Sequence, residues 1–248
     1  MARPIGFVVW EGPGFDGHPC AVIVTGLSGR SKNAKTGDML QTWILRVDTP
    51  PHAAVREGLD VSVCGTCPLA SGNGCYVRVE QAPLAVWKAY HAGRYPRLVG
   101  RSQVVRVLTL AARGRKLRVG SYGDPAVPPA WVWHALIQGT QAPKRTGYTH
   151  AWVSPHEANL QQVCMASVHT ADEAASAHAL GYRTFRTGDD GPLPGEIVCP
   201  ATPEGGEKTT CAECGLCDGS KGPNDRRKNI FAYLHGAKKS RALLAIGG

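Results

Sequence analysis

The stretch QTWILRV at residues 41–47 is a continuous and largely apolar run. A run of this length and composition predicts a strand that is buried on both faces, as in a parallel sheet. A cysteine-containing loop follows, and then comes APLAVWKAYHAG at 82–93, where Pro83 suits a first helical turn and Gly93 can end the helix. We therefore expect a strand, a loop and a helix in series, which is the repeating unit of α/β proteins.

The same alternation continues towards the C-terminus. Thr170 and Glu173 have the spacing of a helical capping box, and glycine or proline separates the other runs. The predicted strands are 116–124, 147–154, 163–169, 182–187 and 195–201, and the further predicted helices are 102–114, 128–139 and 170–181. About six such strands fit a TIM-barrel-like parallel barrel, complete or partial. A doubly wound open sheet is the alternative.

The chain of 248 residues is short enough to form one α/β domain. Two β-branched runs, at 7–12 and 21–27, precede the first buried strand. The predicted parts of the domain are a β-rich lead-in (1–40), the barrel core (41–201), and a cysteine-rich loop with a basic tail (202–248). Neither an apolar run of about 18 residues nor a secretory leader is visible. We expect no membrane contact and a location in the reducing cytoplasm.

Seven of the nine cysteines fall in two tight groups, and short spacings in a cytosolic protein indicate metal or redox sites. The first group is Cys64, Cys67 and Cys75, and the second is Cys199, Cys211, Cys214 and Cys217. The other two, Cys20 and Cys164, lie in apolar surroundings. We predict that these two are small buried hydrophobic residues.

The second group has the pattern C-x11-C-x2-C-x2-C, and its first cysteine precedes Pro200. Ferredoxin-type [4Fe–4S] clusters use three cysteines at C-x2-C-x2-C and a remote cysteine that is followed by proline. Zinc is the alternative, although zinc sites with four cysteines usually have two separated C-x2-C pairs. Three cysteines in one series favour a [4Fe–4S] cluster at Cys199, Cys211, Cys214 and Cys217.

The first group has the spacing C-x2-C-x7-C and supplies three thiolates rather than four. One interpretation is a second cluster with an open iron position, where a substrate or a cofactor could bind. The other is a complete shell with a fourth ligand from elsewhere, such as Cys20, Cys164 or a histidine. A zinc knuckle completed by His91 is one form of this second interpretation.

Several polar residues follow predicted strands, whose carboxyl ends share one rim in a parallel barrel. The two cysteine groups and the stretch GSYGDP (120–125) follow strands, and His150 and His169 are placed in or at the end of strands. We therefore expect all of these groups to converge on one rim. A ligand or catalytic role for the two histidines competes with a role in packing.

The formal net charge of +9 is spread mainly over 101–118 and 225–241. Such a charge is typical of proteins that bind nucleic acid or phosphorylated substrates, and a solvated basic face is the alternative. Three functions are therefore open. They are an enzyme, a non-catalytic iron–sulfur or zinc module that binds nucleic acid or a host protein through its basic surface, and a structural protein held together by zinc.

The order of these parts resembles the radical S-adenosylmethionine enzymes. In that superfamily a three-cysteine loop follows the first barrel strand, an aromatic residue lies beside the last cysteine, and a Gly-Gly-Glu-like stretch ends the second strand. Here Tyr76 follows Cys75, and GSYGD follows the next predicted strand. The resemblance implies an open-site [4Fe–4S] cluster on the first cysteine group, with Ser121, Gly123 and Asp124 near S-adenosylmethionine. The cysteine spacing differs from the usual C-x3-C-x2-C of the superfamily.

The chain also resembles a family of bacteriophage proteins. The similar stretches include NAKTGDMLQTWIL, LRVGSYGDP, GYTHAW and TTCAECGLCDG, and together they span most of residues 33–219. The resemblance implies an iron–sulfur α/β barrel of viral origin, located in the cytoplasm of the host cell. It implies no particular activity.

Overall fold

A computed structural model describes residues 4–29, 31, 35–153, 160–235 and 238–247. Within these residues nine strands form one sheet in the order β1-β2-β3-β4-β5-β6-β7-β9-β8. The strands are Gly6–Pro13 (β1), Pro19–Thr25 (β2), Leu40–Arg46 (β3), Leu117–Tyr122 (β4), Arg145–Thr149 (β5), Met165–Val168 (β6), Thr184–Gly188 (β7), Glu196–Val198 (β8) and Asn229–Tyr233 (β9). The β1–β2 and β2–β3 pairs are antiparallel, and every pair from β3 onward is parallel.

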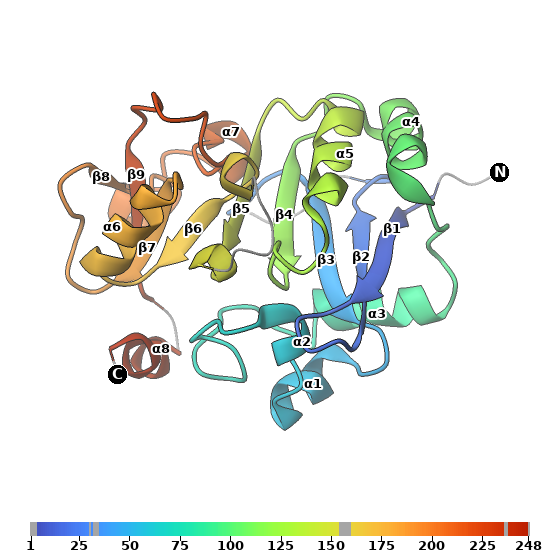
Figure 1. Ribbon diagram of the computed structural model, residues 1–248, viewed down its shortest axis with the longest axis horizontal. Helices are drawn as coiled ribbons and strands as arrows, with labels where there is room; N and C mark the ends of the chain where they lie inside the picture. Colours follow the sequence, from blue (N-terminus) through green and yellow to red (C-terminus); the bar gives the residue numbers. More distant parts are fainter. Residues whose placement is uncertain (1–3, 30, 32–34, 154–159, 236–237, 248) are drawn as a thin grey trace.

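Helices lie on the sheet and at its ends (Figure 1). They are Pro51–Glu57 (α1), Val61–Cys64 (α2), Ala82–His91 (α3), Gly100–Ala112 (α4), Ala130–Thr140 (α5), Ala171–Ala179 (α6), Cys211–Cys214 (α7) and Lys239–Ile246 (α8). The paired helices α4 and α5 lie against the N-terminal half of the sheet, and α6 lies against β6 and β7. The short helices α1 and α2 lie beyond the carboxyl end of β3. No helix among the described residues has the length and apolar character needed to cross a bilayer.

The fold is α/β and its sheet is mostly parallel, as the sequence predicts, but the sheet is not closed. The hairpin of β1 and β2 occupies the edge of β3 where a closing strand would have to pair. The predicted strands and helices are all present with shifted ends, except that residue 154 lies outside the described residues. The predicted basic tail contains the strand β9, which the sequence did not predict. This strand lies between β7 and β8 in the sheet.

Gly139 does not end its helix, contrary to the sequence reading. A Cβ atom there would lie 3.0 Å from the carbonyl oxygen of Val105 on α4. The glycine therefore lets α4 and α5 approach each other closely. The helix continues to Thr140 and ends at Gln141, whose φ of 47° is in the left-handed region.

Arg186 on β7 is completely buried and joins three parts of the C-terminal half of the sheet. Its guanidinium donates to both carboxylate oxygens of Glu196 at the start of β8 and to both of Asp190 in the loop after β7. It also lies over the ring of Phe231 on β9, 4.5 Å from the ring centre. The short strand β8 is thus held by an ion pair as well as by its backbone ladder.

Replacing Arg186 by methionine should lower the free energy of unfolding by about 3–5 kcal/mol, because the buried Glu196 would lose its counter-ion. Urea denaturation measures this change. Arg56→Ala is the matched control, since its ion pair with Glu57 is exposed and should change stability by no more than about 0.5 kcal/mol. Coincident urea midpoints for the two variants would contradict this account of β8.

Candidate metal centres

The three-cysteine loop lies beyond the carboxyl end of β3. Cys64 is the last residue of α2, which Gly65 ends with a φ of 56°. Successive turns then fold the loop back, because the N–H of Cys67 donates to the carbonyl of Cys64 (3.2 Å) and that of Cys75 to the carbonyl of Leu69 (3.0 Å). Cys67 and Cys75 both act electrostatically on the thiol of Cys64, and Cys75 acts on that of Cys67, so the three lie near one another.

The buried side chain of Asp60 holds this loop in place. Such an anchor is needed because the loop contains few apolar side chains that could pack. The carboxylate is buried, and it accepts hydrogen bonds from the backbone N–H of Ser71 (2.8 Å) and from its hydroxyl (2.6 Å). Ser71 has a φ of 51°, which is unusual for a residue other than glycine. A buried carboxylate and a serine in the left-handed region therefore set the path between Cys67 and Cys75.

The thiols of this loop are protonated near neutral pH in the metal-free chain. Burial raises the pKa of Cys64 well above its ordinary value, and the nearby Asp60 carboxylate adds to the effect. Burial raises the pKa of Cys67 to about 12 and also raises that of Cys75, although backbone N–H groups of Leu69 and Val77 act in the opposite direction. Because a metal binds the thiolate, metal loading must release protons.

The loop after β4 packs directly against the three-cysteine loop. The N–H of Asp124 donates to the carbonyl of Val63, the residue before Cys64 (2.7 Å). Gly123 has a φ of 80°, and a Cβ atom there would lie 2.7 Å from the carbonyl oxygen of Ile44 on β3. The backbone of Asp124 thus lies beside the start of the cysteine loop, and Gly123 lies against the end of β3.

The Asp124 carboxylate already has several hydrogen-bond donors. It accepts from the hydroxyl of Thr149 (2.6 Å) and from the N–H groups of His150 (2.7 Å) and Ala126 (2.9 Å). Burial raises the pKa of Asp124 overall, and these hydrogen bonds oppose the rise. Ser121, the third residue of the predicted cofactor set, donates to the side chain of Gln41 on β3 (2.8 Å). Asp124 therefore positions two strand ends, and Ser121 joins β4 to β3.

The second cysteine group lines one small hollow. Cys199 directly follows β8 and extends its ladder by donating to the carbonyl of Phe231 (2.7 Å). The next three cysteines come from α7 and the turn after it, and all four thiols face the same hollow together with Tyr148 and Ile230. The hollow measures about 20 Å³, which is room for about one water molecule. Burial raises the pKa of Cys217 to about 12 and also raises the pKa values of Cys199 and Cys211.

A capping box starts the helix that carries two of these cysteines. The hydroxyl of Thr210 accepts from the N–H of Glu213, and the Glu213 carboxylate accepts from the N–H of Thr210. Gly215 ends this single turn with a φ of 69°. The glycines also serve close packing, because a Cβ atom on Gly219 would lie 2.6 Å from the carbonyl oxygen of Gln161.

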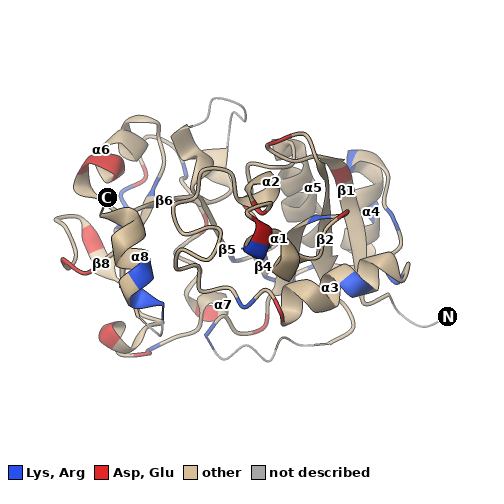
Figure 2. Cartoon of the chain, turned by 90° about the horizontal axis from the view of Figure 1, so that it is seen from below, with Lys and Arg blue, Asp and Glu red and all other residues tan. Residues whose placement is uncertain are grey.

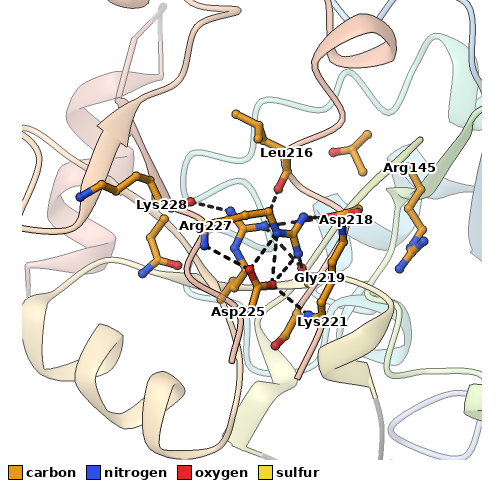
Figure 3. A network of polar contacts seen from close by, with 12 residues as sticks. Arg145, Leu216, Asp218, Gly219, Lys221, Asp225, Arg227 and Lys228 are labelled. Atoms are coloured by element: carbon orange, nitrogen blue, oxygen red, sulfur yellow. Dashed lines mark hydrogen bonds and ion pairs between the residues drawn. The ribbon is translucent and has the colours of Figure 1, made fainter. Parts of the chain in front are cut away.

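Ion pairs hold the segment that follows Cys217 (Figure 3). The guanidinium of Arg227 lies between the carboxylates of Asp218 and Asp225 and also donates to the carbonyl of Gly219 (2.8 Å). Arg183, which directly precedes β7, is buried and donates to the carbonyl of Leu216 (2.6 Å). Two arginines therefore fix the backbone on both sides of Cys217, a function that the sequence reading did not assign to them.

The two cysteine groups do not share one rim, contrary to the sequence prediction. The N–H groups of Cys211 and Ala212 donate to the carbonyls of Lys35 and Thr36, which precede β3. The carbonyl of Cys217 accepts from Gly147 on β5. Helix α7 therefore lies at the amino ends of these strands, at the opposite end of the sheet from α2 (Figure 1). The chain after β8 returns along the sheet, and this return determines where α7 lies.

Tyr76 and Arg118 lie between the two cysteine groups and contact each other. Tyr76, next to Cys75, is 70% exposed, and its hydroxyl accepts from the guanidinium of Arg118 on β4 (3.0 Å). Arg118 in turn lies within electrostatic range of Cys211 and of Tyr148, which lines the hollow. The pair Tyr76–Arg118 thus links the three-cysteine loop to the surroundings of the second group.

The candidate fourth ligands for the first group have other contacts. Cys20 and Cys164 are buried, as predicted, and their thiols face the carbonyls of Ser62 (3.9 Å) and Leu160 (3.7 Å). His91 places its Nε2 atom 2.8 Å from the carbonyl oxygen of Val47. None of the three therefore completes the shell in this structure.

Across the described ranges, no group of three or more His, Cys, Asp or Glu side chains has the geometry to hold one metal ion. The chemistry of the donor sets does fit a metal, because four thiols line one hollow and three occupy one loop.

Comparisons with known proteins give no identification. The chain matches no family model, no curated protein and no solved structure.

In the metal-free protein at pH 8, iodoacetamide should modify Cys67 and Cys217 at least about tenfold more slowly than it does in urea. A pKa of about 12 leaves far less thiolate than the value of about 8.5 in an unfolded chain. Peptide mass spectrometry measures both rates, and the urea-unfolded chain is the control. Equal rates in the folded and unfolded chains would show that these thiols are not buried as described.

Proposed function

We propose that the protein is an iron–sulfur protein whose second cysteine group holds a [4Fe–4S] cluster. The observation that carries the proposal is the convergence of Cys199 with the three cysteines of 211–217 on one hollow. These residues come from two separate segments, and the C-x2-C-x2-C spacing is typical of cluster ligands. With four thiolates this site would be closed, and it would serve structure or electron transfer.

The first cysteine group is proposed to hold a second cluster with one iron open to a ligand. Cys64, Cys67 and Cys75 supply three thiolates, and the three candidates for a fourth ligand have other contacts. This loop lies at the carboxyl ends of parallel strands, which is where parallel α/β enzymes bind their substrates. The location supports an enzyme more than a structural zinc site.

The further proposal is a radical-S-adenosylmethionine-like enzyme on a partial barrel. The sequential order of the parallel strands from β3 to β7 supports a barrel-like arrangement. Cys64, Cys67 and Cys75 would hold this cluster, which would supply an open iron for S-adenosylmethionine and one-electron chemistry when an external reductant is present. In this chain Gly123 permits close approach of the β4 loop to β3, and Asp124 anchors that loop to α2. Tyr76 is exposed beside the open site and could contact the ligand.

Basic side chains provide a weaker argument for a binding module. Lys and Arg segments occur on α3, α4 and α8, and acidic segments are interspersed among them (Figure 2). This distribution resembles a solvated surface more than a single stripe for nucleic acid. The enzyme is therefore the function that we propose.

The protein reconstituted anaerobically should contain about eight iron atoms per chain and absorb at about 400 nm. The double variant Cys211→Ser and Cys214→Ser should lose about half of the iron, and Cys20→Ala should keep all of it, because Cys20 belongs to neither site. Iron analysis measures the change. Colourless protein with stoichiometric zinc, or full iron in the double variant, would overturn the assignment of the cluster.

Addition of S-adenosylmethionine should change the electron paramagnetic resonance spectrum of the reduced protein. The change should be absent in Cys67→Ser, which loses a ligand of the open cluster, and present in the double variant at 211 and 214. A wild-type spectrum that is unaffected by S-adenosylmethionine would favour the non-catalytic module over the enzyme.

A further inference from the structure

Two histidines occupy the ends of neighbouring parallel strands. His150 directly follows β5 and His169 directly follows β6. Their rings are stacked, with centres 5.4 Å apart and planes inclined by 23°. Neither ring is used by the proposed cysteine sites. The pair lies at the carboxyl end of the sheet, the same end that carries the three-cysteine loop.

Hydrogen bonds from their backbone N–H groups fix both histidines. The N–H of His150 donates to the carboxylate of Asp124 (2.7 Å), and the N–H of His169 donates to that of Glu173 (2.6 Å). The Nδ1 atom of His169 lies 2.8 Å from the hydroxyl of Thr187 on β7. Because one ring nitrogen of His169 has a partner, its Nε2 atom is directed elsewhere in a fixed orientation.

Both Nε2 atoms are buried without a hydrogen-bond partner among the described residues. His169 is only 8% exposed. Burial lowers the pKa of both imidazoles, to about 3 for His150, so both rings are neutral near pH 7. A buried polar atom without a partner costs free energy, and a site that retains two of them is suited to a ligand that satisfies both.

We propose that the Nε2 atoms of His150 and His169 bind a divalent transition-metal ion. Neutral imidazole is the form that binds such ions, and it is the form that burial enforces here. Metal-binding histidines usually donate their other N–H to an oxygen, and the Thr187 hydroxyl can accept from Nδ1 of His169.

The distance between the ring centres allows both imidazoles to bind one ion. With a metal–nitrogen distance of about 2.1 Å, two imidazoles on one tetrahedral ion have ring centres about 5 Å apart. The observed 5.4 Å is close to this value. Among the described residues two side chains are assigned to the ion, and its remaining positions would be filled by water or by an anionic group of a substrate. Asp124 connects this site to the three-cysteine loop through its bonds to His150 and Val63.

The test is a cobalt titration of the anaerobically reconstituted protein. The wild-type chain should bind one more equivalent of Co²⁺ than the double variant His150→Gln and His169→Gln, at equal iron content. The extra cobalt should show weak visible bands without the intense thiolate charge-transfer absorption of a cysteine site. Glutamine preserves bulk and polarity, and equal urea midpoints check that the variant is folded. His18→Ala is the control, because this histidine is half exposed and remote in sequence.

Thr187 provides a second and independent variant. Thr187→Val should weaken cobalt binding about 10- to 100-fold, and Thr187→Ser should preserve it, because only the hydroxyl is needed. Equal cobalt stoichiometry in wild type and in the double histidine variant would overturn the proposal. Bound cobalt that shows only the thiolate charge-transfer absorption of a cysteine site would also overturn the proposal. The iron content separately reports on the cysteine clusters, so a failure of one proposal is distinguishable from a failure of the other.

Discussion

The carboxyl end of this sheet depends on the buried side chain of Asp124. Its carboxylate accepts from Thr149 and from the N–H of His150, and its own N–H donates to Val63 beside Cys64. One residue thus joins the loop after β4, the end of β5 and the helix that carries the first cysteine. The hydrogen bonds from Thr149, His150 and Ala126 offset part of the cost of burying this carboxylate.

Local patterns in the sequence were sufficient for most of the fold. Buried strands such as β3 and the capping box of α6 depend on neighbours in sequence, and both occur where predicted. Strand β9 was missed because NIFAY is short and lies within a basic stretch. Its position between β7 and β8 depends on a long-range pairing that no local pattern encodes. The sequence also left a complete barrel possible, because the pairing of β2 with β3 is not visible in either strand alone.

The candidate site shows the same limit. Cysteine spacing grouped Cys199 with the three cysteines of 211–217, and these four residues line one hollow in the structure. The prediction that this group shares a rim with the first cysteine group was wrong. Helix α7 is held by hydrogen bonds to the carbonyls of Lys35 and Thr36, about 175 residues earlier in the chain. Asp60, Arg183 and Arg227 were missed although each fixes a cysteine segment. The only signal for Asp60 was an acidic residue just before a short helix, which is common without any such role.

The two cysteine groups differ in what surrounds them, and this difference bears on function. The second group is enclosed by Tyr148 and Ile230, and arginines hold the backbone that carries it. The first group lies in a loop organised by Asp60, with the exposed ring of Tyr76 beside it. Since Tyr76 also bonds to Arg118, and Arg118 lies near Cys211, a change in charge at either group would be felt at the other. This electrostatic link would couple the charge of the proposed cluster at the second group to that of the proposed cluster at the first.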